Sequence, residues 1–203
     1  FVHLLDDAPD QLTRGSKVSA FVDRRRRQAI QRHHTVTHLF HWALHEVVSR
    51  DASQKGSYVG PDKLTFDFNA KPLTPTQIED VERLVNERIL ANEPVHWFEV
   101  DHDAVKGRED VMQFFGDKYA NQVRVVQIGG EAEKLDGFSM ELCGGTHTRS
   151  TGEIGVFKVT GEAAISAGIR RVEAIAGDVA VAETVADRQL IQRLAGRINS
   201  PVG

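Results

Sequence analysis

Apolar and polar residues alternate with two different periods along this chain, and the two periods predict a mixed α+β fold. Residues 64–68 alternate strictly between apolar and polar, which is typical of a β-strand. Further strands are expected at residues 95–100, 123–128, 155–159 and 169–175. Helical spacing is found instead at Ile78, Val81, Val85 and Ile89. We therefore expect a mixed or antiparallel sheet flanked by helices.

Boundary signals delimit these helices. Thr74, Pro75 and Gln77 form an N-terminal capping pattern, and Asn92 with Pro94 predicts the end of that helix. A short helix is expected at roughly residues 108–115, followed by a charged loop at 129–139 that covers the site or projects into solvent. A last helix should begin at Asp178 and carry a partial apolar stripe: Val181, Val185, Ile191, Leu194 and Ile198.

The segment before residue 24 shows alternation at Val18, Ala20 and Val22, and Arg14 to Ser16 has the composition of a turn. One or two strands are therefore expected there. The pattern divides the chain into a leading segment at 1–23, a domain at 24–177 and a last helical segment at 178–203. Because the chain starts at Phe1, we expect it to be a piece of a longer protein.

A histidine-dense run lies between Arg32 and His45. At about 100° per residue, one side of a helix there gathers Val36, Phe40, Ala43 and Val47. The other side gathers His34, His38, His41 and His45. Two pairs share the four-residue spacing that lets both imidazoles reach one ion, His34/His38 and His41/His45. A solvated histidine face is the alternative, and spacing alone leaves it open.

A second ligand pair occurs far along the chain, in Cys143-Gly144-Gly145-Thr146-His147. Cys143 is the only cysteine, and it precedes two glycines that permit close approach of the backbone to a ligand. A thiolate with three imidazoles would complete the tetrahedral set that Zn²⁺ favours. The alternative is a buried free cysteine that acts as a small apolar residue.

Composition narrows the function classes. The net charge of −4 excludes a generally basic nucleic-acid-binding surface, so any RNA contact must use local clusters such as the arginines at 24–27. A solvated helix start is the other interpretation of that run. A single cysteine excludes an intramolecular disulfide and fits the reducing cytoplasm. No apolar run approaches membrane-spanning length, and no signal peptide is visible.

Several motifs together resemble one family. They are the histidines at 34 and 38, the run Gln54-Lys55-Gly56-Ser57, the strand at 64–68, the stretch at 115–119, Leu142 to His147, and Gly168-Ile169-Arg170-Arg171 with its continuation to Ala174. This set is similar to the editing domain of alanyl-tRNA synthetases and to freestanding alanyl-tRNA editing proteins. The editing domain of threonyl-tRNA synthetases shares the metal pattern.

The resemblance implies a domain order, a function and a site. Residues 1–23 would be the end of a preceding β-barrel, 24–177 the zinc-dependent editing domain and 178–203 a linker helix. It implies hydrolysis of tRNA(Ala) mischarged with serine or glycine, with zinc held by His34, His38, Cys143 and His147. It places Gln54 in the editing pocket beside Thr37, which we take as the contact for the seryl hydroxyl. Cys143 is counted with these two as catalytic. The remaining synthetase chain and the tRNA acceptor end would be the partners, with no membrane role.

Other assignments stay open at this stage. Arg24 and Arg25, together with Arg170 and Arg171, are RNA-contact candidates, and the last two should point to opposite faces of a strand. One of that pair is expected to meet a core carboxylate. His33 either competes as a ligand or is only a neighbour. The competing function is a zinc-stabilised tRNA-binding module without activity of its own. A trans-editing protein of the alanyl or threonyl type is a further alternative.

Overall fold

A computed structural model describes residues 12–113 and 119–198. Its elements follow in the order α1 (Arg24–Val47), β1 (Gln54–Val59), β2 (Leu64–Asn69), α2 (Pro75–Leu90), β3 (Val95–Asp101), α3 (His102–Val105), β4 (Gln122–Ile128), β5 (Ser139–Leu142), the 3-10 helix η1 (Thr151–Ile154), β6 (Phe157–Ser166), β7 (Ile169–Ala176) and α4 (Asp178–Arg197). The strands form two antiparallel sheets, ordered β1-β2-β7-β6 and β3-β4-β5. The expected α+β class is confirmed.

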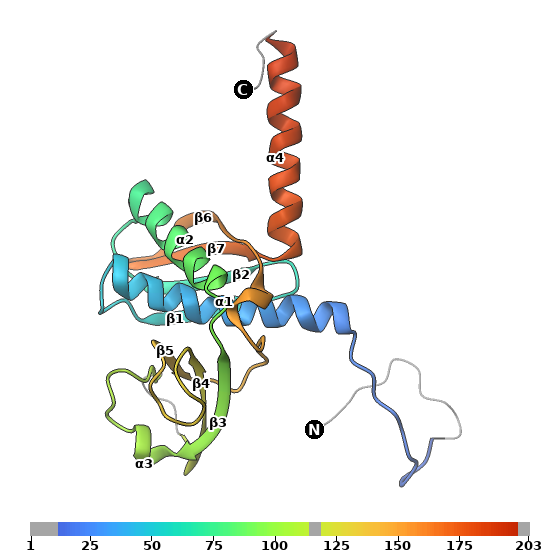
Figure 1. Cartoon of the computed structure of the whole chain (residues 1–203), viewed down its shortest axis with the longest axis vertical. Helices are drawn as coiled ribbons and strands as arrows, with labels where there is room; N and C mark the ends of the chain where they lie inside the picture. Colours follow the sequence, from blue (N-terminus) through green and yellow to red (C-terminus); the bar gives the residue numbers. More distant parts are fainter. Residues whose placement is uncertain (1–11, 114–118, 199–203) are drawn as a thin grey trace.

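Helix α1 runs between the two sheets and contacts strands of both (Figure 1). Asp23 caps it by accepting a hydrogen bond from the Arg26 amide at 3.0 Å. The side of the helix that carries the histidines is covered by protein: His38 and His41 are each only 4% exposed. A solvated histidine face is therefore wrong for this helix. Because both imidazoles are buried, each needs a hydrogen-bonding or ionic partner inside the protein.

The main core lies between α1, α2 and the four-stranded sheet. Phe40 of α1 packs edge-on against Phe66 of β2, with ring centroids 5.4 Å apart, and also contacts Phe68 and Phe157. The apolar side of α2 closes this core, as its spacing predicts: Val81, Val85 and Ile89 are buried. This packing fixes α1 along its length, and with it the angular position of each histidine.

The capping pattern of α2 is confirmed. Thr74 Oγ1 accepts from the Gln77 amide at 3.2 Å, and Gln77 Oε1 accepts from the Thr74 amide at 3.0 Å. The helix ends at Leu90, and Asn92 adopts φ = 53° just beyond it. Both predicted boundaries of this helix therefore hold.

The three-stranded sheet carries the second ligand pair and has its own small core, formed by Val105, Val111, Val123, Val125, Met140 and Leu142. Strand β5 was not predicted, although polar and apolar residues alternate along it, because four residues are too short a run to stand out; all four are buried. Cys143 follows β5 directly, whereas the charged loop joins β4 to β5 at the other end of the strand. Among the residues that line the pocket at Cys143, none comes from this loop.

Two local predictions are wrong. Residues 12–23 form no strand and are exposed along their length, because no neighbouring strand pairs with them, although the predicted turn is present at Arg14 and Gly15. Residues 1–11 of that prediction lie outside the described part. Residues 108–113 are not helical; the short helix α3 comes earlier, at His102–Val105. Residues 114 and 115 of the predicted helix also lie outside the described part.

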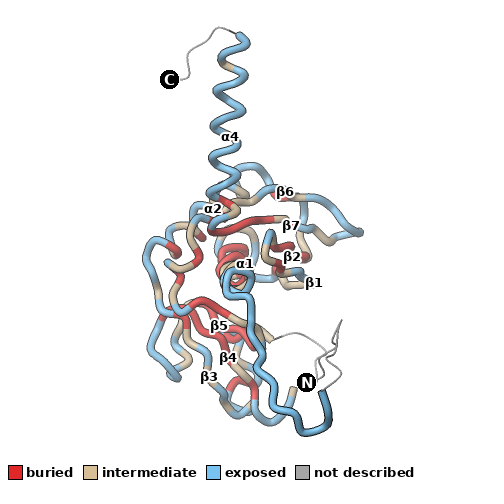
Figure 2. Tube along the Cα trace, turned by 90° about the vertical axis from the view of Figure 1, so that its right-hand side faces the viewer, coloured by how far each residue is buried: buried red, intermediate tan, exposed pale blue. Residues whose placement is uncertain are grey.

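Helix α4 departs from the body of the molecule (Figures 1 and 2). Its N-cap is Gly177 rather than Asp178, which pairs instead with Arg32 at 3.1 Å. The predicted apolar stripe exists but is exposed, and Val181, Val185, Ile191, Leu194 and Ile198 each exceed half exposure. Only the first half of the helix contacts the domain, through buried Ala180 and the Lys158–Asp187 ion pair, so the apolar stripe as a whole does not pack back onto it. Across the described ranges, no helix has the length and apolar character needed to span a membrane.

Candidate metal centre

Four potential metal ligands, two from each of the distant sequence pairs, meet at one place. His34 and His38 come from α1, and Cys143 and His147 come from the turn after β5. One donor atom of each lies within 4.8 Å of all the others. Cys143 Sγ is 3.4 Å from His34 Nε2 and 3.4 Å from His147 Nε2. The tertiary structure thus assembles the set that the sequence predicted.

The three imidazoles surround a common point. The ring centroids of His34 and His147 are 4.5 Å apart, those of His38 and His147 are 5.0 Å apart, and those of His34 and His38 are 5.6 Å apart. Gly145 allows this crowding, because a Cβ added there would lie 1.8 Å from His34 Cε1. A side chain at this position would displace the His34 ring.

Glu141, one residue before the end of β5, contacts His38 of the cluster and the neighbouring His41. The residue is 4% exposed, and its carboxylate lies 2.7 Å from His38 Nδ1 and 2.8 Å from His41 Nδ1. An anion beside Nδ1 keeps the proton of His38 on that nitrogen. Nε2 then faces the other ligands, and its lone pair would be available to a metal ion that displaces the second proton of the imidazole. Sequence reasoning missed Glu141; its place two residues before the cysteine was the available signal.

A second support orients His147. Thr35 Oγ1 accepts a hydrogen bond from the Thr148 amide at 3.0 Å and lies 3.2 Å from His147 Nδ1. With the Nδ1 proton directed at this hydroxyl, His147 Nε2 is free to bind an ion. Arg124 of β4 bonds to the carbonyls of Cys143 and Gly145, which holds the glycine turn in place.

Charges inside the cluster shift the pKa values of its members. Burial alone would raise the pKa of Cys143, but the imidazoles of His147 and His34, each with a nitrogen 3.4 Å from the sulfur, and the nearby His38 lower it to about 3. Burial lowers the pKa of His147 to about 4. For His38, burial acts downward, yet the Glu141 carboxylate raises the pKa to about 10. The sulfur is therefore a thiolate, the form that binds metals.

The other histidines of the run have structural partners. His33 lies 2.8 Å from the Gly60 carbonyl through Nδ1, and its Nε2 accepts from the Ala176 amide at 3.0 Å. His41 contacts Glu141, and His45 Nε2 donates to the Ala52 carbonyl at 2.7 Å. None of the three belongs to the metal cluster, so the His34/His38 register is the one that the fold uses.

A small pocket of about 160 Å³ opens onto the cluster, and Thr37 and Gln54 line it together with His34, His38 and Cys143. The Thr37 hydroxyl donates to the His33 carbonyl at 2.7 Å, so the back-bonded alternative for this residue is present. Its oxygen still has lone pairs that can accept from a ligand. Gln54 begins strand β1 rather than a loop, and its Nε2 donates to Ser57 Oγ at 2.9 Å.

Comparison with known proteins places the chain in a family. Residues 123–173 match the model of the threonyl and alanyl tRNA synthetase second additional domain. The chain is 48% identical over 180 residues to the alanine–tRNA ligase of Akkermansia muciniphila, covering 88% of the chain and 19% of that protein. It is 51% identical over 169 residues to the enzyme of Methylacidiphilum infernorum, covering 83% and 18%. The chain is homologous to one segment of the alanine–tRNA ligases.

Another alanine–tRNA ligase shows similar identity and coverage. The alanine–tRNA ligase of Bordetella pertussis is 46% identical over 189 residues, which is 92% of the chain and 20% of that enzyme. The chain therefore spans about a fifth of the length of the curated alanine–tRNA ligases that it matches. Cys143 and His147 fall inside the range matched by the family model, and His34 and His38 lie outside it.

The donor set fits a zinc ion. Nitrogen and thiolate donors in a compact group are the ligands that this ion prefers. His38 Nε2 is fully buried and has no hydrogen-bond partner in the described ranges. Leaving such an atom unpaired costs free energy unless a ligand occupies the space in front of it. The group can hold a metal ion, and the chemistry of its donors favours zinc.

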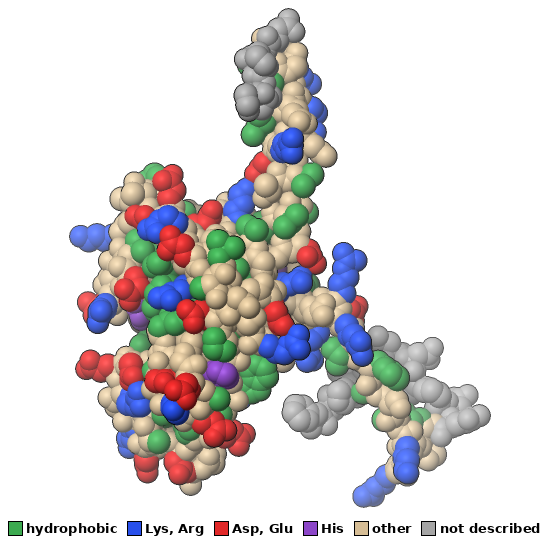
Figure 3. All heavy atoms as spheres, viewed as in Figure 1, with side chains coloured by type: hydrophobic (Ala, Val, Ile, Leu, Met, Phe, Trp, Pro, Cys, Tyr) green, Lys and Arg blue, Asp and Glu red, His purple; other side chains and the backbone are tan. Residues whose placement is uncertain are grey.

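The four candidate RNA-contact arginines differ in environment. Basic side chains stand at the surface where α1 begins, and Arg24 and Arg25 are among these exposed residues (Figure 3). Arg170 and Arg171 point to opposite faces of β7, as expected, but both meet a carboxylate: Glu162 and Asp67, respectively. Only one was expected to do so. Arg171 keeps 45% of its side chain exposed and Arg170 keeps 14%.

Proposed function

We propose that this chain hydrolyses the ester of tRNA(Ala) mischarged with serine and, to a lesser degree, glycine, as the editing part of an alanine–tRNA ligase. The observation that carries the proposal is the four-ligand cluster with a pocket opening directly onto it. Homology to alanine–tRNA ligases over most of the chain supports it. The partner would be the acceptor end of tRNA(Ala), and the reaction would take place in the cytoplasm.

The physical need for such a site follows from the amino acids. Glycine lacks one methyl group of alanine, and serine adds one hydroxyl to it. A single binding pocket discriminates such differences by only about 1–3 kcal/mol. A second site that uses the hydroxyl as a positive contact rejects the alanyl ester, because its own polar atoms would be left unpaired.

The chemistry is ester hydrolysis. A water oxygen attacks the carbonyl carbon, the bond from that carbon to the ribose oxygen breaks, and a proton passes to the ribose oxygen. The products are the free amino acid and an intact tRNA. Bound zinc supplies Lewis-acid polarisation and orientation at such a site. His34, His38, Cys143 and His147 would hold it, while the backbone amides of the glycine turn and Gln54 orient the ester.

Thr37 would supply the selectivity for serine. Its hydroxyl proton is committed to the His33 carbonyl, so towards the pocket it can only accept. A seryl hydroxyl can donate to that oxygen, and an alanyl methyl cannot. This complementarity favours serine over alanine without a charged group in the pocket.

Hydrolysis of seryl-tRNA(Ala), measured with and without a chelator, tests the proposal. The variants His34→Ala and Cys143→Ala should lose activity, whereas His96→Ala, on β3 and outside the cluster, should keep it. Circular dichroism on the same samples separates loss of activity from loss of fold, because some zinc domains unfold without metal. Equal rates in all samples would end the proposal. Tight tRNA binding without cleavage would instead favour the purely RNA-binding function.

The role of Thr37 has its own test. Thr37→Val keeps the shape but removes the acceptor oxygen, so cleavage of the seryl ester should fall by about tenfold, the worth of roughly one hydrogen bond. Cleavage of the glycyl ester, which has no side-chain hydroxyl, serves as the internal control and should change little. A parallel fall in both rates would assign Thr37 to positioning of the helix instead.

A further inference from the structure

Arg124 of β4 differs from the other half-buried arginines in its partners. Each of the others pairs with a carboxylate: Arg32 with Asp178, Arg88 with Glu93, Arg108 with Asp110 and Arg170 with Glu162. Within residues 12–113 and 119–198, Arg124 forms no ion pair, although Glu99 lies opposite it on β3. A partly buried cation needs acceptors, so the groups that Arg124 contacts instead indicate its role.

Those acceptors belong to the turn that carries Cys143. One guanidinium nitrogen of Arg124 donates to the Cys143 carbonyl at 3.3 Å and also to the Gly145 carbonyl. The main-chain carbonyl of Arg124 accepts from the Cys143 amide at 3.1 Å. Arg124 therefore binds both main-chain polar groups of this ligand residue and the carbonyl of the residue two positions further on.

The turn itself has little to fix its conformation. Gly144 and Gly145 lack the side chains that would restrict rotation of their peptide units. Gly145 must stay a glycine, since a Cβ there would lie 1.8 Å from His34 Cε1, whereas a Cβ on Gly144 would meet open space. The orientation of the two carbonyls therefore depends on tertiary contacts, and Arg124 supplies them.

The fixed turn directs one amide at the sulfur. The Gly145 N–H donates to Cys143 Sγ at 3.4 Å. This amide belongs to the peptide unit that lies between the two carbonyls bound by Arg124, so rotation of either neighbour would turn the N–H away from the sulfur. Hydrogen bonds to a cysteine sulfur withdraw electron density from it and tune the metal that it binds.

Trp97 of β3 contacts the same guanidinium. The Arg124 Cζ atom lies over the indole ring, 5.6 Å from its centroid. The indole is 44% exposed, and it lines a surface hollow together with His147. A cation–π contact favours a charged group held over the ring, so Trp97 restricts where the guanidinium can lie.

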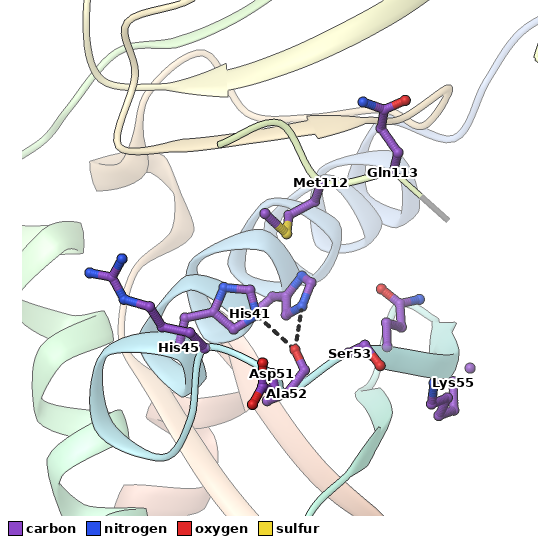
Figure 4. A pocket seen from close by; sticks show the side chains of 11 residues that line it. His41, His45, Asp51, Ala52, Ser53, Lys55, Met112 and Gln113 are labelled. Atoms are coloured by element: carbon purple, nitrogen blue, oxygen red, sulfur yellow. Dashed lines mark hydrogen bonds between the residues drawn. The ribbon is translucent and has the colours of Figure 1, made fainter. Parts of the chain in front are cut away.

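The segment before Gln54, which also lines the metal pocket, is held by different residues. His41 Nε2 lies 3.3 Å from the Ala52 carbonyl, and His45 Nε2 lies 2.7 Å from it (Figure 4). These three residues and Gln54 line a second cavity of about 550 Å³ next to the metal pocket. Loss of the Arg124 side chain should therefore alter the cysteine side of the metal pocket and leave the Gln54 side unchanged.

We infer that Arg124, with its contact to Trp97, is a positioning residue of the metal site: it orients the turn at 143–145 so that the Gly145 N–H stays directed at the thiolate. A thiolate that donates less electron density leaves a bound metal ion a stronger Lewis acid. Arg124 thus acts on hydrolysis through the turn, without touching the ester. The kinetic part of this inference rests on the proposed function, and the part that concerns the metal site does not.

Two measurements on Arg124→Leu test the metal site directly. The Zn²⁺ affinity, from competition with a chromophoric chelator, should fall by about tenfold, as is typical when a contact behind a ligand is lost. In the Co²⁺ form, the sulfur-to-metal charge-transfer band should move to lower energy, because the amide no longer withdraws charge from the thiolate. Arg124→Lys keeps the charge and a donor, so it should recover part of both effects.

Arg149→Leu is the matched control. It removes an equal charge two residues after His147, from a side chain that is 85% exposed and pairs with Glu153. Affinity and band should not change in this variant. An unaltered affinity and band in Arg124→Leu, or equal shifts in Arg149→Leu, would overturn the inference.

A second variant keeps the test independent of folding. Urea unfolding of the metal-free samples shows whether Arg124→Leu folds. Trp97→Ala changes an exposed residue and leaves Arg124 in place, and it should lower the Zn²⁺ affinity by about two- to fivefold, the worth of an exposed cation–π contact. If Arg124→Leu does not fold, Trp97→Ala and Arg124→Lys decide the question, and wild-type affinity in both would refute the positioning role.

Hydrolysis of seryl-tRNA(Ala) at saturating Zn²⁺ gives a kinetic readout. In Arg124→Leu, kcat should fall by about tenfold and KM should stay the same, because the residue does not contact the substrate. A higher KM with unchanged kcat would assign Arg124 to RNA binding and overturn the inference.

The two kinds of readout separate this inference from the proposed function. If the band and the affinity shift but no sample cleaves the ester, the positioning role at the metal site stands and the proposed function fails. If cleavage depends on metal but Arg124→Leu matches the unaltered chain in affinity, band and kcat, the inference fails and the proposed function stands.

Discussion

Glu141→Gln should weaken metal binding without unfolding the chain. The carboxylate lies within 2.8 Å of one nitrogen of His38 and one of His41, and it is almost fully buried. Glutamine has the same shape but only one acceptor oxygen, so one of the two histidines must face an amide N–H. If that histidine is His38, its proton moves to Nε2, the atom needed for the metal.

The expected size of this effect follows from the position of Glu141 behind a ligand. Loss of such a partner typically reduces metal affinity by about 10–100-fold, or roughly 1.4–2.7 kcal/mol. Stability of the metal-free chain should fall by about 1–3 kcal/mol, because one buried polar atom is left unpaired. The affinity loss is therefore large enough to resolve in a competition assay.

Competition for Zn²⁺ against a chromophoric chelator measures the affinity, and urea unfolding of the metal-free protein measures the stability. Glu99→Gln is the matched control, since Glu99 is exposed on β3 and should leave both values unchanged. Cobalt substitution gives a third readout, because its absorption spectrum reports the ligand set. Unaltered zinc affinity in Glu141→Gln would refute the argument that this carboxylate sets the His38 proton.

Three further outcomes are expected. Gly145→Ala should weaken metal binding in the same chelator assay, because its new Cβ would overlap a ligand ring, whereas Gly144→Ala has open space and should bind as before. Thr74→Ala should lower stability by about 1 kcal/mol in urea unfolding, since it removes a formed capping box; no change would mean that the cap is redundant. Arg170 lowers the pKa of Glu162 through a hydrogen bond, so the ion pair stabilises the fold above the ordinary carboxyl pKa of about 4.5 and loses its effect as pH falls below it. The stability difference between the unaltered chain and Glu162→Gln should therefore shrink between pH 5 and pH 3, and a constant difference would contradict the assignment.

Local patterns predicted those elements whose determinants are local. The capping box at Thr74 and the apolar spacing that follows it were sufficient for α2. The alternation at 64–68 predicted β2, although burial of Thr65 and Asp67 shows that the strand is covered on both faces. The pattern failed for residues 12–23, where alternation is present but no partner strand is. Strand pairing is non-local, so alternation alone cannot report it.

For α4, the local pattern predicted the element correctly but not its surroundings. Its spacing correctly indicated a helix with an apolar side, but whether that side is covered depends on neighbours that the sequence does not identify. In the same way, the choice between the His34/His38 and His41/His45 pairs could not be made by spacing. It depends on which face of α1 meets the turn after β5.

By itself, the sequence determined most of the helices and strands of the core and the candidate ligand pairs, because these depend on residue type and on spacing along the chain. Spacing left His34/His38 and His41/His45 equivalent, and the family resemblance chose between them. Only the tertiary structure brought the pairs within 4.8 Å of one another and set Glu141 behind His38. It also placed Arg50 and Lys55 around a second cavity. These features arise from packing α1 between two sheets, and contacts between residues a hundred positions apart have no signature in local periodicity.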